Sequence, residues 1–356
     1  MTGANELEIL TVGRVGVDLY PEQQGPLADV LTFAKFLGGT ATNVAVGAAR
    51  LGRRSAVLTK VGDDGFGTFV RTALTGFGVD PSYVGTSPDL HTPVVFCELN
   101  PPADPPLLFY RDPIAPDLTL SAADVPWDLV TDVPLLWVTG TGVSVEPARS
   151  TQLEMLSRRG RPAVGTGRHT VLDLDWRAMF WPSPEHARAE YAAMLQYVDV
   201  VVGNRAEAEV AVGTTDPVEA AHRLLAAGVT LAMFKKGAEG VLVATVDGMT
   251  TVAAHLVEVV CGLGAGDAFG AALAHGLLAG WDPVDIAVHA NAAGAIVASR
   301  LACADAMPTL EELDHLLSEE GTTLLVATDH PASVTTPATN GSAHPGTASR
   351  PTRGCR

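Results

Sequence analysis

Short apolar, β-branched segments alternate with helix-like segments along most of the chain. The apolar segments are typical of buried strands: residues 7–15, 55–62, 134–140, 170–176, 198–204 and 229–237. The segments between them are typical of helices, and several end on a glycine that can close a helix: 42–52, 66–78, 147–160, 184–198 and 217–228. Strands that alternate with helices favour a parallel sheet covered on both faces. Ligands of such sheets bind beyond the carboxyl ends of the strands, so residues that follow each strand matter most for function.

Two stretches break this alternation, residues 16–37 and residues 91–112. Each is strand-like and carries proline-rich turns, and long insertions in compact domains are often active-site lids. We expect them to form a small β lid at one edge of the sheet, although surface loops without a function have the same composition. An exposed edge of that lid can pair with a second copy of the chain, so the sequence leaves open a homodimer through the lid.

The composition changes at about residue 326. Residues 326–356 are rich in Thr, Ala, Pro, Ser and Gly and contain almost no large apolar side chain. Such a segment cannot bury a core, so the sequence predicts one folded domain over residues 1–325 and a disordered tail after it.

Charge and hydropathy limit the classes of partner. The chain has 23 Lys and Arg against 40 Asp and Glu, a net charge of −17, which argues against a protein that coats nucleic acid or an anionic membrane. A local basic pocket can still bind a small anion. The mean hydropathy of +0.22 is high, but the most apolar stretch, residues 268–280, is too short for a membrane span and the N-terminus lacks a signal-peptide pattern. The four cysteines form no C-x-x-C pair, which indicates a reducing, cytoplasmic compartment.

The segment from Cys261 to Gly280 points most directly to chemistry. A turn of small residues precedes a helix: Gly264, Ala265 and Gly266. Small residues let backbone N–H groups approach an anion, and the helix dipole adds positive charge there. Asp267 lies in the first turn of this helix, where it can accept a proton from an attacking hydroxyl. An ordinary glycine-rich turn, with Asp267 only stabilising the helix, would have the same spacing.

This segment resembles the C-terminal signature D-T-x-G-A-G-D of the PfkB (ribokinase-like) carbohydrate kinases. The other signature of that family is similar to Gly38–Ala45, where a Gly-Gly turn opens a helix. Two motifs in this order, about 220 residues apart, are more specific than either alone, and the resemblance runs from about residue 8 to residue 317. It implies an α/β ribokinase-like three-layer sandwich, with a mostly parallel central sheet and a small β lid.

The resemblance also implies a reaction and assigns roles to residues. The reaction is ATP-dependent phosphorylation of a primary hydroxyl on a sugar, in which Asp267 takes the proton and the N–H groups at Gly264, Ala265 and Gly266 hold the γ-phosphoryl charge. Residues expected to bind the sugar hydroxyls are Asp18, Gly38, Gly39, Asn43 and Asp175. Arg111 of the lid and Arg177 of the sheet are expected to pair with a substrate carboxylate.

The remaining matches fall in the expected nucleotide region. Residues expected to bind ATP are Asn204, Lys236, Gly237, Gly240 and Asn291, and Glu207 is expected to hold Mg²⁺ through water. Each residue also has a plain structural explanation. Arg177 can be a surface ion-pair partner, Glu207 a solvated helix residue, and Asn43 a buried amide bonded to backbone.

Within the family the chain is most similar to members that phosphorylate a keto-deoxy sugar acid in the breakdown of inositol. The segments that carry this likeness are Gly13-Arg14, Val17–Leu19, Thr32–Gly39, Tyr110–Asp112 and Cys303–Pro308. Kinases of 2-keto-3-deoxygluconate, fructose or ribose are the alternatives, and nucleoside kinases fit the arginine pair less well.

The chain departs from the family pattern at two places. Cys261-Gly262 replaces the Asp-Thr pair, whose aspartate helps to form a monovalent-cation site in relatives, and Asp175 replaces an asparagine. The need for a monovalent cation therefore stays open. A non-catalytic sugar- or nucleotide-binding protein on the same fold is the alternative from another class.

Overall fold

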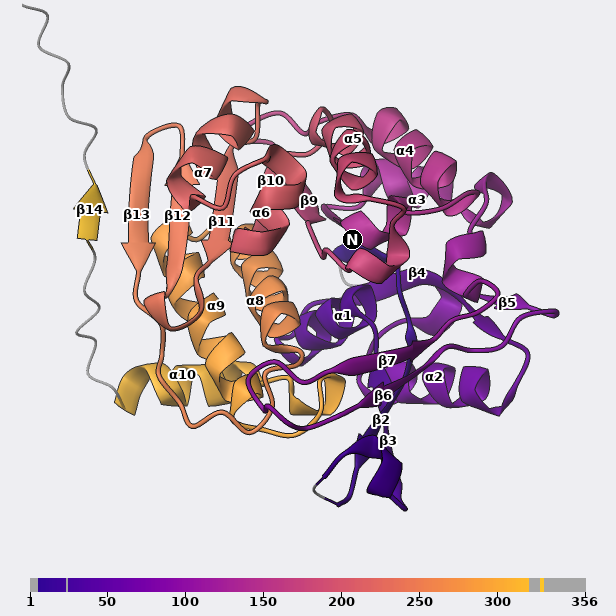
Figure 1. Cartoon of the computed structure of the whole chain (residues 1–356). Helices are drawn as coiled ribbons and strands as arrows, with labels where there is room; N and C mark the ends of the chain where they lie inside the picture. Colours follow the sequence, from indigo (N-terminus) through magenta and orange to yellow (C-terminus); the bar gives the residue numbers. More distant parts are fainter. Residues whose placement is uncertain (1–5, 24, 320–326, 330–356) are drawn as a thin grey trace, which may run out of the picture.

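A long twisted sheet forms the middle layer of the protein (Figure 1). The computed structural model describes residues 6–23, 25–319 and 327–329. The strand order is β14-β13-β12-β11-β10-β9-β8-β1-β4-β5, with parallel pairing from β11 to β5 and antiparallel pairing from β11 to β14. The strands are β1 (Ile9–Val12), β4 (Ser55–Gly62), β5 (Val84–Ser87), β8 (Leu135–Thr139), β9 (His169–Asp173), β10 (Val200–Asn204), β11 (Leu231–Lys235), β12 (Val241–Thr245), β13 (Gly248–Val252) and β14 (Ala327–Asp329).

Helices cover both faces of this sheet. One face carries α1 (Thr40–Arg50), α2 (Gly65–Gly76), α8 (Ala265–Ala279), α9 (Pro283–Ala298) and α10 (Leu310–Glu319). The other carries α3 (Trp127–Asp132), α4 (Ala148–Arg159), α5 (Pro184–Leu195), α6 (Arg205–Val212) and α7 (Pro217–Ala226). Strand side chains alternate between the layers, since Trp137 belongs to the core of the first face and Leu136 to that of the second. The predicted three-layer α/β fold is confirmed. Among the described residues, no helix has the length and apolarity to cross a membrane.

The two stretches that interrupt the alternation form the predicted lid. It is a separate sheet with the order β3-β2-β6-β7, made of β3 (Phe33–Gly38), β2 (Gly16–Pro21), β6 (Val94–Cys97) and β7 (Leu107–Tyr110). Edge-to-face aromatic pairs, Tyr20 with Phe36 and Phe33 with Phe96, hold its strands together. The lid lies beside the N-terminal ends of α1 and α8 (Figure 1).

The predicted tail falls mostly outside the described residues. Of residues 326–356, only Ala327–Asp329 are described, and they form β14 against β13, with Asp329 opposite Met249. The open edge of β13 offers backbone partners to these three residues, and the predicted tail stays a prediction.

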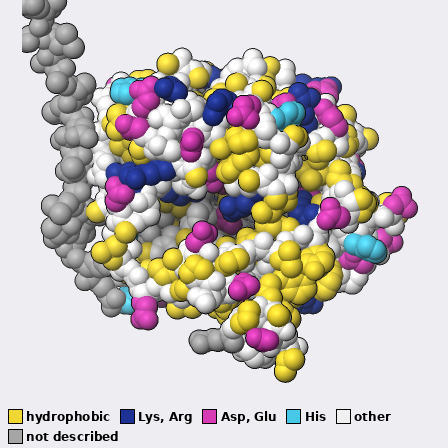
Figure 2. Space-filling view, in the orientation of Figure 1, with side chains coloured by type: hydrophobic (Ala, Val, Ile, Leu, Met, Phe, Trp, Pro, Cys, Tyr) yellow, Lys and Arg dark blue, Asp and Glu magenta, His cyan; other side chains and the backbone are white. Residues whose placement is uncertain are grey.

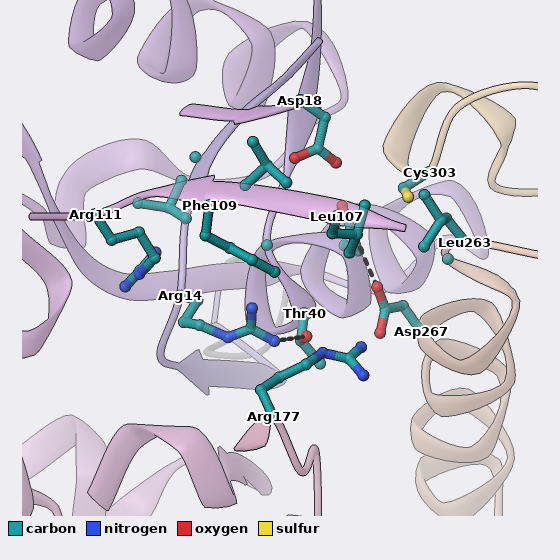
Figure 3. Close-up of a pocket in the computed structure, with 16 residues that line it drawn as sticks. Arg14, Asp18, Thr40, Leu107, Phe109, Arg111, Arg177, Leu263, Asp267 and Cys303 are labelled. Carbon is teal, nitrogen blue, oxygen red and sulfur yellow. Dashed lines mark hydrogen bonds between the residues drawn. The ribbon is translucent and has the colours of Figure 1, made fainter. Parts of the chain in front are cut away.

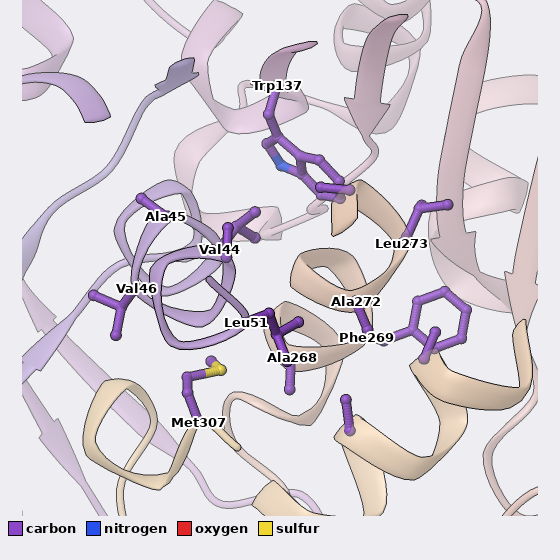
Figure 4. Close-up of a cluster of buried hydrophobic side chains, with 14 of the residues drawn as sticks. Val44, Ala45, Val46, Leu51, Trp137, Ala268, Phe269, Ala272, Leu273 and Met307 are labelled. Carbon is purple, nitrogen blue, oxygen red and sulfur yellow. The ribbon is translucent and has the colours of Figure 1, made fainter. Parts of the chain in front are cut away.

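Helices α1 and α8 pack very closely because small residues line their contact (Figure 4). A Cβ added to Gly47 of α1 would lie only 2.5 Å from the Cβ of Ala271 on α8. On the same helix α8, a Cβ on Gly270 would lie 2.7 Å from the buried Trp137 ring. Glycine permits this approach, and it brings the N-terminal ends of both helices to the same edge of the sheet.

The α1–α8 contact yields a stability prediction. Replacing Gly47 by Val should lower the free energy of unfolding by about 1–3 kcal/mol, because the new methyl groups overlap Ala271 and Met307. Urea denaturation measures the loss. Gly76→Val, at the end of α2 with open space around it, is the matched control and should cost less than about 1 kcal/mol. Equal losses in the two variants would show that the close contact is not what stabilises this layer.

Candidate active site

Two adjoining cavities lie at the carboxyl end of the sheet, between the lid and the helices. The first, of about 60 Å³, lies under the lid; the second, of about 690 Å³, extends along the ends of β9, β10 and β11. They share a wall that includes Thr40, Arg177, Gly264 and Asp267. Figure 2 shows this face hollowed between lid and body, with Lys and Arg side chains around the hollow. We call the first the lid cavity and the second the open cavity.

Asp267 lies where the two cavities meet, in the first turn of α8. The helix begins after Gly264, which has the left-handed φ of +80° that glycine adopts readily. Asn43 of α1 donates a hydrogen bond from Nδ2 to Asp267 Oδ2 at 2.7 Å. Burial raises the pKa of Asp267 to about 6, and the hydrogen bond from Asn43 limits that rise. A carboxylate with a pKa close to neutrality is suited to accept a proton at physiological pH.

Asp18 of β2 is a second buried carboxyl in the lid cavity (Figure 3). Burial, opposed by the positive charge of Arg14 and reinforced by the negative charge of Asp267, raises its pKa to about 7. Gly38 leaves room for Asp18, since a Cβ there would lie 2.2 Å from the carboxyl group. Gly39 has a φ of +105° and a Cβ there would lie 2.4 Å from the carbonyl oxygen of Arg14. The Gly-Gly turn is thus required for the backbone to approach this closely.

Three arginines line the lid cavity, and they differ in their partners (Figure 3). Arg14 Nη2 donates to both oxygens of Asp175, at 2.8 and 2.7 Å, and to Thr40. Arg111 Nη2 donates to both oxygens of Asp117, at 2.6 and 2.7 Å. Arg177 has a 3.8 Å contact from Nε to Asp175 and a long hydrogen bond from Nη1 to the Trp176 carbonyl at 3.4 Å, and its side chain is 41% exposed. Of these three arginines, Arg177 has the weakest contacts with a carboxylate.

Asp175 is held by its neighbours and does not stand free in the cavity. It accepts hydrogen bonds from Arg14 and from the Thr141 hydroxyl, and its φ of +34° is unusual for a residue with a side chain. Burial raises the pKa of Asp175, but the guanidinium groups of Arg14 and Arg177 more than offset this and lower it below the usual value. Its carboxylate therefore serves to hold arginines.

The open cavity contains a partly buried cation, Lys235, that the sequence did not predict. Lys235 ends β11 and lines this cavity, and a Cβ on Gly266 would lie 3.1 Å from its Nζ. Burial disfavours the charged ammonium, but the carboxylates of Asp173 and Glu207 more than offset this and raise the pKa of Lys235. The predicted Lys236 lies outside the cavity lining, and its Nζ donates to Thr251 Oγ1 at 3.2 Å.

Two of the remaining nucleotide-site residues cap the helix that follows β10. Asn204 Oδ1 accepts from the backbone N–H of Glu207 at 3.0 Å, and Glu207 Oε2 accepts from that of Asn204 at 2.7 Å. Both line the open cavity, as does Gly237. Carboxylate oxygens such as those of Glu207 suit Mg²⁺, although the described residues contain no group of three side chains able to hold a metal by themselves.

Five predicted residues lie outside the linings of both cavities: Gly38 and Lys236, described above, and Gly240, Ala265 and Asn291. Gly240 has a φ of +86°, and a Cβ there would lie 2.0 Å from the Val252 carbonyl oxygen, so it closes the turn between β11 and β12. Asn291 of α9 donates from Nδ2 to the Ala253 carbonyl at 2.8 Å. Ala265 is the first residue of α8, between two glycines that do line the open cavity.

The segment that replaces the Asp-Thr pair has no carboxylate. Cys261 is buried beside Tyr20, Cys97 and Cys303, all free thiols apart from the tyrosine. Burial raises the pKa of the Cys261 thiol, so it stays neutral. A neutral thiol and a glycine therefore supply no negative charge at the position of the expected Asp-Thr pair.

Comparison with known proteins decides the family. The model of the pfkB family of carbohydrate kinases matches residues 6–310. The chain belongs to this family. It is 30% identical over 322 residues to a 5-dehydro-2-deoxygluconokinase of Clostridium tetani, covering 88% of this chain and 94% of that protein. A 5-dehydro-2-deoxygluconokinase of Bacillus subtilis is also 30% identical, over 318 residues, with coverage of 88% and 96%.

Solved structures agree with this assignment. A sugar kinase of Pyrococcus horikoshii in complex with ATP superposes with a TM-score of 0.71 at 26% identity, covering 87% of this chain and 97% of that one. A fructokinase of Vibrio cholerae with fructose, ADP and calcium superposes with a TM-score of 0.76 at 26% identity, covering 87% and 99%. The protein is a PfkB carbohydrate kinase, a phosphotransferase, and the predicted family and enzyme class are confirmed.

The Asn43–Asp267 hydrogen bond yields a pH prediction for this kinase. If Asp267 must be ionised, kcat/KM rises with pH through its pKa of about 6. Replacing Asn43 by Ala removes a bond that lowers this pKa, so the rising limb should move to higher pH. The shift is measured by determining kcat/KM from pH 5 to 9 with a sugar that the enzyme accepts. Arg50→Gln, at the far end of α1, is the control. If the rise of kcat/KM with pH does not move in Asn43→Ala, the ionisation of Asp267 is not the one that controls the rate.

Proposed function

We propose that this kinase transfers the γ-phosphoryl group of ATP to the primary hydroxyl of an acidic sugar, 5-dehydro-2-deoxy-D-gluconate. The product is the 6-phosphate, in the catabolism of myo-inositol. The proposal rests mainly on the position of Arg177. Its guanidinium lines the same cavity as Asp267 and lies no closer than 3.8 Å to a carboxylate. A planar guanidinium binds a carboxylate through two parallel hydrogen bonds. The 30% identity to 5-dehydro-2-deoxygluconokinases over 88% of the chain supports the same sugar.

The sugar occupies the lid cavity in this proposal. Asp18, Gly39 and Asn43 bind its hydroxyls, and Arg177 binds its carboxylate. Arg111 is already held by Asp117, so it contributes long-range positive charge and, through its Nε, one free donor. Asp267 lies at the junction with the open cavity, where it accepts the proton of the primary hydroxyl as the oxygen attacks phosphorus.

ATP occupies the open cavity, with its γ-phosphoryl group facing Asp267. The N–H groups at the start of α8 and the ammonium of Lys235 face the phosphates and stabilise the charge that grows in the transition state. Magnesium bound to the phosphates neutralises part of that charge, and Glu207 is the side chain we assign to its water shell. The structure of the Pyrococcus horikoshii sugar kinase in complex with ATP supports ATP as the phosphoryl donor.

The other proposals concern organisation. We place the protein in the cytoplasm as one kinase domain over residues 1–325, without nucleic-acid or membrane partners. A homodimer through the lid stays a prediction, and Leu108 and Tyr110 on the edge strand β7, at 48% and 59% exposure, are the side chains it would cover.

A kinetic panel tests the substrate. ADP release should be fastest with 5-dehydro-2-deoxy-D-gluconate among keto-deoxy acids, including 2-keto-3-deoxygluconate, and neutral sugars such as fructose and ribose. Arg177→Gln should raise KM for the acid roughly 10- to 100-fold, the value of a lost charge-assisted contact, and should leave KM for a neutral sugar nearly unchanged.

The control for this panel is Arg223→Gln, an exposed arginine paired with Glu219 on α7, which should behave like wild type. A wild-type preference for fructose or ribose would replace the proposed substrate. Faster turnover of 2-keto-3-deoxygluconate would favour that acid instead.

A further inference from the structure

The loop between β6 and β7 reaches beyond the lid and covers the open cavity. Residues 98–106 form this loop, and its base is closed by a hydrogen bond from Glu98 N–H to the Pro106 carbonyl at 2.9 Å. Ala103, Asp104, Pro105 and Pro106 line the open cavity together with Asp267 and Lys235. The lid hairpin therefore contributes a wall to the cavity that we assign to the phosphates, in addition to the roof over the sugar.

This cover loop is fixed to the body at Gly262. The Gly262 N–H donates to the Pro102 carbonyl at 2.8 Å. A Cβ added to Gly262 would lie 2.2 Å from the carbonyl oxygen of Ala103 and 2.9 Å from its carbonyl carbon. Both are backbone atoms, which cannot swing aside as a flexible side chain would. Only glycine at this position allows the cover loop to rest where it does.

The segment that carries Gly262 is itself anchored on its other side. The N–H groups of Val260 and Cys261 both donate to the carbonyl of Ala298 on α9, at 2.9 and 3.1 Å. The cysteine side chain is buried among Tyr20, Cys97 and Cys303. Gly264, two residues after Gly262, then begins helix α8 and the phosphate-facing turn. A displacement at Gly262 is therefore transmitted to the cover loop, because the other neighbours of this segment are fixed.

We propose that Gly262 is a positioning residue that docks the cover loop over the phosphate end of the active site, so that the loop excludes water during phosphoryl transfer. Water kept from the phosphates cannot compete with the sugar hydroxyl as acceptor. The inference rests on the proposed assignment of the open cavity to ATP.

The test compares two reactions of the same enzyme. Gly262→Ala should raise the rate of ATP hydrolysis without sugar, relative to sugar phosphorylation, at least about fivefold, because the new methyl group displaces the cover loop. The control is Gly76→Ala, where the added methyl meets open space, and it should leave the ratio unchanged. A role of Gly262 in stability alone would lower both rates together and leave the ratio as in wild type.

A loop variant makes the test specific. Replacing Leu99–Pro105 by Asn-Gly, a sequence suited to a two-residue hairpin turn, removes the carbonyls that contact Gly262. This variant should show the raised hydrolysis by itself, and Gly262→Ala should add nothing in that background. A hydrolysis ratio unchanged by Gly262→Ala, or an equal effect of that substitution with and without the loop, would overturn the proposal.

The readout is independent of which sugar is phosphorylated. Hydrolysis without sugar needs none, and the reference rate can be taken with whichever sugar the panel shows to be accepted. A different preferred sugar would therefore overturn the proposed substrate and leave the docking test intact. Failure of wild type to bind ATP, measured by titration calorimetry, would overturn the ATP assignment and the inference together.

Discussion

The close approach of α1 and α8 is the constraint on which the active site depends. Gly47 and Ala271 allow the two helices to pack with almost no side chain between them, and Gly270 admits the Trp137 ring on the sheet side. Because both helices start at the carboxyl edge of the sheet, this packing brings Asn43 within hydrogen-bond distance of Asp267, although 224 residues separate them. A wider spacing would leave the Asp267 carboxyl buried without a donor, which costs free energy and raises its pKa further.

This arrangement places several ionisable side chains close together at partly or fully buried positions. Asp18 and Asp267 have pKa values near 7 and 6, well above those of free carboxyls. Unfolding releases these carboxyls to ionise at lower pH, so their burial contributes less and less to folding as the pH rises from about 4 to 7. The positive charges of Arg14 and Lys235 oppose the cost, because Arg14 lowers the pKa of Asp18 and Lys235 lowers that of Asp267. The same cations leave the cavities able to bind anions in a protein of net charge −17.

The sequence predicts the main elements well because they depend on local patterns. Alternating apolar segments predict the parallel strands. The turn of small residues before a helix selects Asp267, and the resemblance to the family motif selects Arg177 at a strand end. The roles of individual charged side chains depend instead on the partners that each one contacts in the folded protein. Lys235 ends β11 and is not predicted, because the sequence does not distinguish it from its neighbour Lys236. Only the contacts do so: Lys235 lines the open cavity, and Lys236 donates to Thr251.

Specific side-chain and backbone contacts explain the rest of what the sequence does not reveal. Arg111 lines the predicted cavity, but its Nη2 donates hydrogen bonds to the carboxylate of Asp117, six residues further along. In the sequence, Cys261-Gly262 is only a departure from the Asp-Thr pair of the family signature. The structure shows that the cover loop contacts Gly262. Such docking joins segments about 160 residues apart, and nothing in the composition of either segment predicts it.

The central claim is that Asp267 accepts the proton of the attacking hydroxyl, and the variant Asp267→Asn tests it most directly. The amide preserves the shape of the side chain and can still contact Asn43, but it cannot take up a proton. General-base catalysis contributes about 10²- to 10⁴-fold, so kcat should fall by that order while the affinity for ATP, measured by calorimetry, stays within about threefold of wild type. A variant that turns over at a near-normal rate would contradict the account.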